Sequence, residues 1–504
     1  MNTRILASLL VTFLFFTSCS NDDDNGIMTP DVGDSKSYTL MSVSNEAISG
    51  MVTFKKNNNN TTTVEVDLGG TTSGMHPAHI HMNTAAESGD IAISLEPING
   101  STGMSSTTFS TKDDGTPISY EQLLEFSGYV NVHKSADDLG TLIAQGDIGQ
   151  NELTSDFKTF PLDSRSNPNI MGDAKFTKRV NGTTLIEVML SGTSANGEHP
   201  GHIHFNTAAE GGDIAITFTP LNGETGVSKT QVAMLDDGTA ITYEELLDFN
   251  GYVNIHKSAD DLGTLIAQGD IGQNELTGNS KVFTLDSRSN PNIMGDARFL
   301  ERVNGTTLIK VVLEGTSANG EHPGHIHMNT AAEGGDIAIT LTPLNGETGV
   351  SKTQVAMLDD GTAITYDELL NYDGYVNIHK SADDLGTLIA QGDIGQNELT
   401  GDAMAYTLGT VDNSGVNGEA TFYKRVNGEA LLVIETMGTM AGDSHPSHIH
   451  MGDINNPGDI VVSLNPVEGE SGMSKTNIAM QDGGSTFGYE DALTYNGYPL
   501  CIMI

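Results

Sequence analysis

The fifteen histidines of this 504-residue chain fall into four groups, and corresponding members lie 123 residues apart, as His81, His204, His327 and His450 do. No histidine lies outside these groups. The full set is His76, His79, His81 and His133; His199, His202, His204 and His256; His322, His325, His327 and His379; and His445, His448 and His450. Neutral imidazole suits zinc, copper and nickel, whereas calcium prefers oxygen ligands. The pattern therefore predicts a recurring transition-metal site, with copper or zinc as the expected ion.

The spacing within a group indicates how three imidazoles could meet. In the first group, the two histidines around Ile80 share one face of a strand, roughly 7 Å apart, and Ile80 faces the core. In segment 129–133 two valines share a face, so His133 also points away from the core. The three imidazoles converge if the two strands are neighbours. His76, in the preceding turn, is a candidate fourth ligand or a gate. The alternative is a hydrogen-bonded structural cluster or a stripe of exposed histidines.

Two kinds of neighbouring residue bear on such a site. An Asp four residues after the last histidine of a group could orient a ligand imidazole or could cap a turn; these residues are Asp137, Asp260 and Asp383. The residue after His-Ile-His is Met82, Phe205, Met328 or Met451. Because successive strand residues face opposite sides, we expect these four side chains in the core rather than as copper ligands.

The elements that must position the histidines are predicted to be short strands. Runs of Thr, Val, Ile and Asn, with 58 glycines and no tryptophan, are typical of strands joined by tight turns. Segments 174–180 and 183–190 form a predicted hairpin around Asn181-Gly182, a pair typical of a type I′ turn. Thr-Tyr-Glu-Glu at 242–245 is a capping box that predicts a short helix. The sequence predicts an all-β fold of tandem antiparallel Greek-key β-sandwich or barrel modules, each with one short helix.

The 123-residue step divides the chain into modules, each large enough to bury a core. We place them at residues 36–156, 157–279, 280–402 and 403–504. In the fourth module the pattern predicts Val-Asn-Ile-His-Lys after Tyr498, but the chain reads Pro-Leu-Cys-Ile-Met-Ile. Ile502 therefore stands where a His is expected. We interpret this module as truncated at its C-terminal side by a frameshift, an early stop or degeneration.

Residues 1–18 are predicted to be a lipoprotein signal peptide. A basic start precedes an apolar run over 5–16 that is short for a membrane span. The preceding Phe-Thr-Ser makes Cys19 resemble a lipobox cysteine, so we expect its acylation and a lipid anchor in the membrane. An ordinary secretory signal is the alternative. Residues 19–35 form an acidic linker, and its Asp run at 22–24 resembles a surface-export signal. We expect an exported outer-membrane lipoprotein, exposed at the cell surface if that run acts as a signal.

The charge and cysteine content restrict the partners. The chain has 66 acidic and 23 basic residues, which gives a net charge of −43 with neutral histidines. Phosphate polyanions would be repelled, so nucleic acid is not expected. Only Cys19 and Cys501 are present, which excludes a disulfide framework. The membrane and an extracellular protein remain as candidate partners.

Three landmarks of the first module resemble the CHRD domain, a family named for chordin that also occurs in bacterial secreted proteins. They are the His-Ile-His of 79–81, the Tyr-Val-Asn-Val-His of 129–133 and the Gly-Asp-Ile-Gly of 146–149. The repeated landmarks extend the resemblance over nearly the whole mature chain. It implies the fold more than an activity.

A more distant resemblance is to copper-zinc superoxide dismutase, and it implies a superoxide-dismutase-like or immunoglobulin-like strand arrangement. There a His-x-His strand supplies two copper ligands and a later His-x-x-Ala-Asp-Asp-Leu-Gly segment supplies another. Segments 79–81 and 133–140 are similar to both, and the resemblance implies that Asp137 bridges the ligand shells. The enzyme's zinc-binding loop and disulfide are missing, and Leu142 stands where it carries a substrate-guiding Arg.

Three functions follow from these patterns. The first is a lipid-anchored extracytoplasmic repeat protein that binds copper or zinc through its His clusters, for sequestration or for structure. Its binding should fade below about pH 6, as imidazoles protonate. The second is a non-enzymatic structural or adhesive surface stalk with structural histidines. The third is a superoxide-dismutase-like redox enzyme, which needs an open metal position. No catalytic residue is assigned, because no nucleophile-base pair or phosphate-binding loop occurs.

Overall fold

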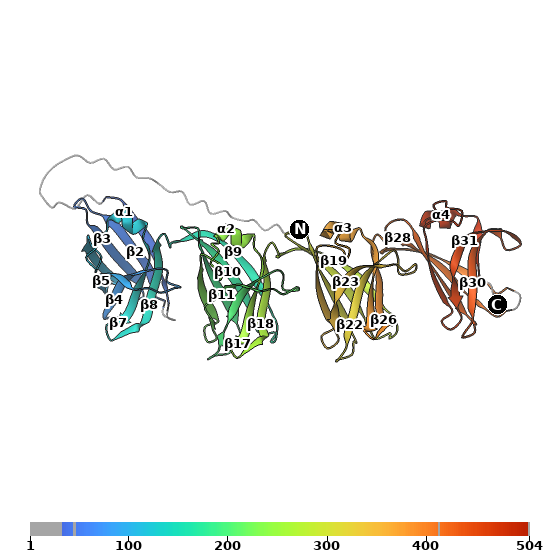
Figure 1. The fold of residues 1–504 in the computed structure, drawn as a ribbon, viewed down its shortest axis with the longest axis horizontal. Coiled ribbons are helices and arrows are strands. Elements are labelled where there is room, and N and C mark those ends of the chain that lie inside the picture. The colour runs from blue at the N-terminus through green and yellow to red at the C-terminus, as the bar shows by residue number, and fades with distance from the viewer. Residues whose placement is uncertain (1–32, 44–46, 412–413, 502–504) are drawn as a thin grey trace, which may run out of the picture. The chain divides into compact units, whose positions relative to one another are not determined.

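The computed structural model describes residues 33–43, 47–411 and 414–501. Cys19, the predicted signal peptide, the acidic run at 22–24 and Ile502 lie outside these residues. Four modules of antiparallel strands follow one another along the chain, each with one short helix (Figure 1). The predicted all-β fold is therefore confirmed. Within the described ranges, no helix is long and apolar enough to cross a membrane.

The bounds of the elements repeat from module to module. The first module has β1 (Ser35–Ser42), β2 (Ser49–Lys56), β3 (Thr62–Gly69), β4 (Met75–Met82), β5 (Ile91–Asn99), β6 (Met104–Phe109), α1 (Tyr120–Leu124), β7 (Ser127–Ser135) and β8 (Asp138–Gly149). The second has β9 (Leu153–Ser164), β10 (Met171–Arg179), β11 (Thr184–Ser191), β12 (Glu198–His199), β13 (Gly201–Phe205), β14 (Ile214–Thr217), β15 (Leu221–Asn222), β16 (Val227–Val232), α2 (Tyr243–Leu247), β17 (Asn250–Ser258) and β18 (Asp261–Gly272).

The third and fourth modules continue the series. The third has β19 (Leu276–Ser287), β20 (Met294–Arg302), β21 (Thr307–Glu314), β22 (Glu321–Met328), β23 (Ile337–Asn345), β24 (Val350–Val355), α3 (Tyr366–Leu370), β25 (Asp373–Ser381) and β26 (Asp384–Gly395). The fourth has β27 (Leu399–Leu408), β28 (Asn417–Arg425), β29 (Ala430–Met437), β30 (Ser444–Asp453), β31 (Asn456–Glu468), β32 (Met473–Ile478), α4 (Tyr489–Thr494) and β33 (Gly497–Cys501).

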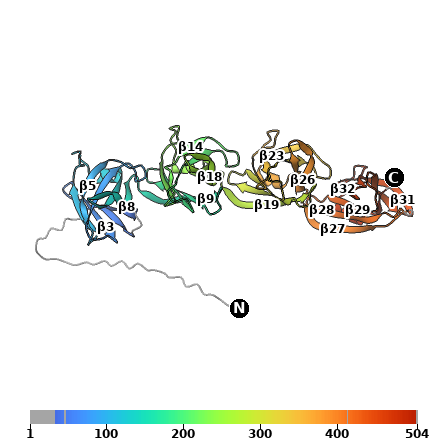
Figure 2. The same cartoon turned by 90° about the horizontal axis from the view of Figure 1, so that it is seen from below.

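Eight strands close into a barrel in the first and third modules. The order in the first is β1-β2-β3-β6-β5-β4-β7-β8, and the third repeats it from β19 to β26. The pairings of β3 with β6 and of β4 with β7 are the crossing connections of a Greek key. In the second module the strands that correspond to β4 and β5 are each divided in two, which leaves the sheet open there. Figure 2 shows β19, β23 and β26 of the third module around their shared interior.

Local sequence explains the strands and helices. Along β3 every second residue is buried, which places Val64 and Val66 in the core of the first barrel. The predicted capping box is present, because the Thr242 side chain accepts a hydrogen bond from the Glu245 N–H at the start of α2. The predicted hairpin of β10 and β11 is also present, but the prediction of a type I′ turn between them is wrong. Only Gly182 of the central pair has a positive φ, +81°, so a type I turn with a left-handed glycine after it forms instead.

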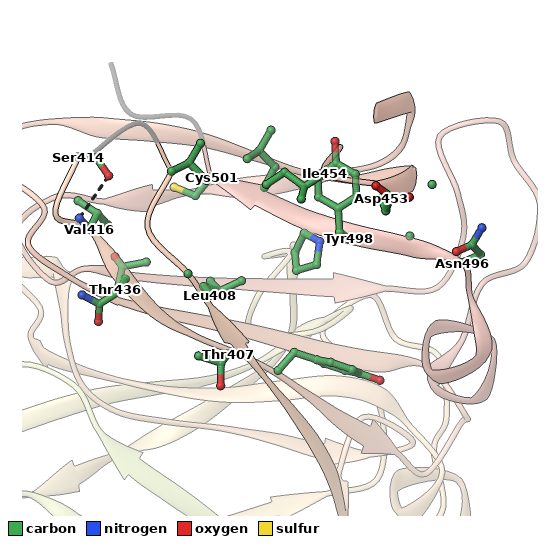
Figure 3. Close-up of a pocket in the computed structure, with 18 residues that line it drawn as sticks. Thr407, Leu408, Ser414, Val416, Thr436, Asp453, Ile454, Asn496, Tyr498 and Cys501 are labelled. Carbon is green, nitrogen blue, oxygen red and sulfur yellow. Dashed lines mark hydrogen bonds between the residues drawn. The ribbon is translucent and has the colours of Figure 1, made fainter. Parts of the chain in front are cut away.

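The fourth module has seven strands among the described residues, with β27 and β33 at the edges of the sheet. In the third module β26 pairs with both β19 and β25 and so closes the barrel. A pocket of about 790 Å³ lies at the corresponding place of the fourth module. Its lining includes Leu408 from β27 and Tyr498 and Cys501 from β33 (Figure 3).

Candidate metal centre

Two neighbouring strands carry the histidines of each triad. In the first module β4 and β7 run antiparallel, with Ile80 opposite Val130 and His81 opposite Tyr129. Ile80 and Val130 are fully buried in the barrel core. Because side chains alternate along a strand, the imidazoles are directed to the opposite face. The condition for convergence, that the two histidine strands are neighbours, is met.

β-bulges redirect the histidines toward one another. The register between β4 and β5 shifts between Ile80 and His81, and that between β7 and β8 shifts on both sides of His133. The second and third modules repeat these shifts at the same positions. A bulge bends its strand and changes the direction of a side chain. The bulges were missed by sequence reasoning, because the alternating pattern of the strands continues through them.

Each of the first three modules brings three imidazoles into one cluster. In the first, one ring nitrogen each of His79, His81 and His133 lies within 4.8 Å of the others. Nδ1 of His79 is 3.2 Å from Nε2 of His133. Two nitrogens bound to one tetrahedral zinc at about 2.0–2.1 Å would lie about 3.3 Å apart, so this spacing fits two ligands. The other triads are His202, His204 and His256, and His325, His327 and His379.

Backbone carbonyls fix the tautomers of two histidines in each triad. The Nδ1–H of His81 donates to the Gly89 carbonyl at 2.9 Å, and that of His133 donates to the Leu139 carbonyl at 2.6 Å. In a neutral ring, a proton on Nδ1 leaves a lone pair on Nε2. Both rings therefore direct an acceptor nitrogen into the cluster. Nε2 of His81 is buried without a hydrogen-bond partner, as it is in His204 and His327.

A tyrosine supports the second histidine of each triad. The Tyr129 ring stacks on His81, with centroids 4.9 Å apart. Its phenol oxygen accepts a hydrogen bond from the Gly89 N–H at 3.1 Å, so one glycine holds both rings. The corresponding stacks in the next two modules, on His204 and His327, have centroid distances of 5.0 Å. Sequence reasoning gave this tyrosine no role, although its 123-residue step was a usable signal.

The first histidine of each group lies outside the triads. His76 is buried, and its Nδ1 is 2.8 Å from the Lys134 carbonyl. His199 and His322 make the corresponding contacts with the carbonyls of Lys257 and Lys380. The hypothesis that these histidines are fourth ligands is therefore not supported. Their rings instead contact backbone carbonyls near the end of the strand that carries the last histidine of each triad. No group of possible ligands among the described residues includes them.

The Asp residues predicted as possible partners of a ligand imidazole do not contact one. Asp137 is exposed in the turn between β7 and β8, and the Leu139 carbonyl accepts the hydrogen bond from the His133 Nδ1–H instead. Asp260 and Asp383 are exposed in the corresponding turns. A different carboxylate lies near the site: Asp113 accepts hydrogen bonds from the N–H and hydroxyl of Ser94, which pairs with His79 across β4 and β5. Its charge acts to raise the pKa of His79, against the larger effect of burial.

The residues after His-Ile-His are not in the core, so that prediction is wrong. Their exposed fractions are 39% for Met82, 38% for Phe205, 40% for Met328 and 50% for Met451. The first three are the last residues of their strands. We attribute the difference to strand ends, where alternation no longer directs a side chain into a packed interior.

Burial favours the neutral form of six of the nine triad imidazoles. It lowers the pKa of His79, His133, His256, His325 and His379 below the usual value. For His202, burial and then the neighbouring His256 and His204 lower the pKa to about 4. Neutral imidazole is the form that binds a metal ion. These rings therefore compete less with protons than free imidazole does.

We expect apo protein to lose stability as the pH falls from about 6.5 toward 4. The unfolded chain takes up protons near the reference pKa of about 6.5, whereas the folded His202 does so only near 4. The free energy of unfolding should therefore be flat above this window and decrease through it. NMR titration of the imidazole signals should place the His202 midpoint well below 6. A midpoint near 6.5 would contradict the burial of the triad.

The fourth module holds two of the three imidazoles. The centroids of His448 and His450 are 6.0 Å apart, and His450 Nδ1–H donates to the Gly458 carbonyl at 3.1 Å. Nδ1 of His448 is buried without a partner. In the described part of this module no third ligand joins the pair, so it is a natural control for the complete triads.

Comparison with known proteins relates the first module to a protein family. None of the curated proteins matches this chain. The family model for the CHRD domain matches residues 37–142. This range runs from β1 into β8 and contains His79, His81 and His133, so it includes both the barrel strands and the triad. The first module is therefore a CHRD domain.

Proposed function

We propose that this chain is a repeat protein that binds three transition-metal ions, copper or zinc, one at each complete His triad. The observation that carries the proposal is the convergence of three ring nitrogens in three modules, with two tautomers in each fixed by carbonyls. Imidazole nitrogen is a preferred ligand for both metals. Carbonyl partners for the second ring nitrogen are the usual support of metal-binding histidines.

The unsatisfied nitrogens favour a metal site over a purely structural cluster. A buried polar atom without a partner costs about 1–3 kcal/mol. Such an atom recurs at His81, His204 and His327, at the same place in each triad, and the corresponding atom of His450 in the incomplete pair is also unsatisfied, as are those of His199 and His322 outside the triads. A hydrogen-bonded structural cluster would satisfy these nitrogens within the protein. A metal ion at the centre would accept their lone pairs and remove the cost.

Three ligands favour a site that can exchange its ion. Structural zinc sites usually have four protein ligands, whereas three leave a position for water or another ligand. The remaining histidine of each four-membered group, such as His76, is directed to the backbone. The net charge of −43 would raise the local concentration of cations. We therefore favour sequestration of metal over a structural role for it.

We further propose that the protein is exported and anchored by a lipid on Cys19 in the outer membrane. The support is the lipobox-like sequence before Cys19 and the acidic run after it. The modules would then hold metal outside the cytoplasm, where an extracellular protein is a candidate partner. Incorporation of labelled palmitate tests the anchor, and retention of the label in Cys19→Ser would overturn it.

The metal content of the purified full chain tests the binding. We expect three equivalents of zinc or copper per chain at pH 7.5, measured by mass spectrometry after removal of loosely bound ion. The triple variant His133→Ala, His256→Ala and His379→Ala should bind less than half an equivalent. The matched control His448→Ala, in the incomplete pair, should keep three. Equal metal content in the triple variant and the parent would contradict the proposal.

A further inference from the structure

The loop that supports each triad is held by two side chains from the end of its own module. In the second module, loop 206–213 carries the carbonyl of Gly212, which accepts the Nδ1–H of His204 at 2.9 Å. Asp270 Oδ1 accepts the main-chain N–H of Ala208 in this loop at 2.8 Å. Asn274 donates from its side-chain amide to the carbonyl of residue 206 at 2.7 Å. The loop therefore depends on a carboxylate and an amide near the end of β18.

The same two residues bind an arginine of the following module. Arg302, the last residue of β20, has Nη1 2.8 Å from Asp270 Oδ2 and also donates to the carbonyl of Asn274. Arg302 is fully buried, and the Asp270 side chain is only 15% exposed. Each oxygen of this carboxylate thus has its own partner: Oδ1 binds the loop of the metal site, and Oδ2 binds the next module.

Backbone hydrogen bonds align this junction. Val303 N–H donates to the Glu275 carbonyl at 2.9 Å, and Asn304 N–H donates to the Gln273 carbonyl at 3.1 Å. The turn after Arg302 is therefore fixed against the segment after β18. The guanidinium position follows from this docking rather than from the side chain alone.

The junction repeats between the third and fourth modules. Arg425 is fully buried, with Nη1 2.8 Å from Asp393 Oδ2 and a second bond to the Asn397 carbonyl. Asp393 Oδ1 accepts the N–H of Ala331, in the loop after His327. The first module has Lys56 at the corresponding position, and this side chain pairs with Glu121 of its own module. Within their own barrels, Arg302 also donates from Nε to Gln354 Oε1 at 2.6 Å, and Arg425 donates from Nε to Asn477 Oδ1 at 2.7 Å.

We propose that Arg302 and Arg425 are positioning residues, each of which holds the metal triad of the preceding module. The inference rests on the proposed metal binding. Without the guanidinium, the Asp270 carboxylate, which is only 15% exposed, would lose its ion-pair partner, which is unfavourable for a charge so shielded from water. The carboxylate would then move toward water, and loop 206–213 would lose its anchor. The Gly212 carbonyl would no longer hold His204 with its Nε2 lone pair in the site.

A crossed experiment in the full chain tests this coupling. One parent keeps only the second triad, through His81→Ala and His327→Ala, and the other keeps only the third, through His81→Ala and His204→Ala. Arg302→Gln and Arg425→Gln are introduced separately into each parent, and zinc affinity is measured by chelator competition. We expect Arg302→Gln to lower the zinc affinity of the second triad about 10–100-fold, as loss of an outer-shell partner does. The zinc affinity of the third triad should be unchanged. Arg425→Gln should do the reverse.

The two arginine substitutions are chemically identical and equally buried, so each controls for the other. Equal weakening of both triads by one substitution would show general destabilisation and overturn the proposal, and so would an unchanged affinity at the adjacent triad. If a Gln variant does not fold, Arg302→Lys and Arg425→Lys in the same crossed design decide. Lysine keeps the charge but not the planar geometry of the guanidinium, so we expect a smaller loss of zinc affinity, confined to the adjacent triad.

Hydrogen exchange of the metal-free chain separates this inference from the metal proposal. Arg302→Gln should speed amide exchange in loop 206–213 and leave the corresponding loop 329–336 unchanged. If neither parent binds zinc, the proposed function is wrong. The amide exchange rates still test whether Arg302 positions loop 206–213. Unchanged exchange in loop 206–213 would contradict the role of Arg302.

Discussion

Replacing His256 by alanine is expected to weaken zinc binding at the second triad by more than about 100-fold. Loss of an outer-shell partner alone costs about 10–100-fold, and His256 supplies one of three ligand nitrogens. Its Nε2 lies 3.2 Å from Nδ1 of His202, so the substitution also removes the imidazole that faces that ring. Chelator competition should show two tight sites per chain instead of three.

Two other histidines provide the controls for this result. His448→Ala, in the fourth module, should leave all three sites tight. His199→Ala should also keep three sites, because this buried ring binds the Lys257 carbonyl rather than the cluster. The substitution should instead lower the free energy of unfolding by about 1–3 kcal/mol, the cost of leaving a buried carbonyl without a hydrogen-bond partner. A loss of affinity in His199→Ala as large as in His256→Ala would restore the fourth-ligand hypothesis.

Ile203→Ala is expected to destabilise the second module by about 2–5 kcal/mol, the usual cost of removing a large buried aliphatic side chain. Ile203 lies between two ligand histidines, is fully buried and faces Val253 on the neighbouring strand. Its burial fixes which face of β13 carries the histidines. Urea unfolding followed by hydrogen exchange should show the loss in peptides of the second module, since a multidomain chain need not unfold in one step.

The matched control for this substitution is Phe205→Ala, on the same strand. Phe205 is 38% exposed, so its removal should cost much less than that of Ile203. Zinc at 100 times its dissociation constant should raise the free energy of unfolding of the Ile203→Ala module by about 2.7 kcal/mol. Equal costs for the two substitutions would contradict the assignment of Ile203 to the core face.

The strand faces that carry the triads could be predicted from the sequence, but their convergence could be predicted only on the condition that the two strands are neighbours. Alternation around Ile80 and within 129–133 was enough to place three imidazoles of the first module on one face. The capping box at Thr242 identified the helix for the same reason, because both signals are local. The fate of His76 could not be predicted, since its partner is the carbonyl of Lys134, 58 residues away.

The missed features depend on contacts between distant segments. A bulge at His133 leaves the alternating sequence unchanged, so only the pairing with β8 reveals it. The bond from Arg302 to Asp270 joins two modules, and neither residue lies in a motif that the histidines suggested. The exposure of Met82 follows from where β4 ends, which local alternation does not encode.

X-ray absorption at the zinc edge, on the full chain loaded with three equivalents, tests the central claim most directly. The triads predict an average of three imidazole nitrogens per zinc at about 2.0–2.1 Å, with an oxygen ligand such as water in the remaining position. The strongly acidic surface offers many carboxylates as competing sites. A first shell dominated by carboxylate oxygens, with fewer than two imidazoles per zinc, would contradict the account.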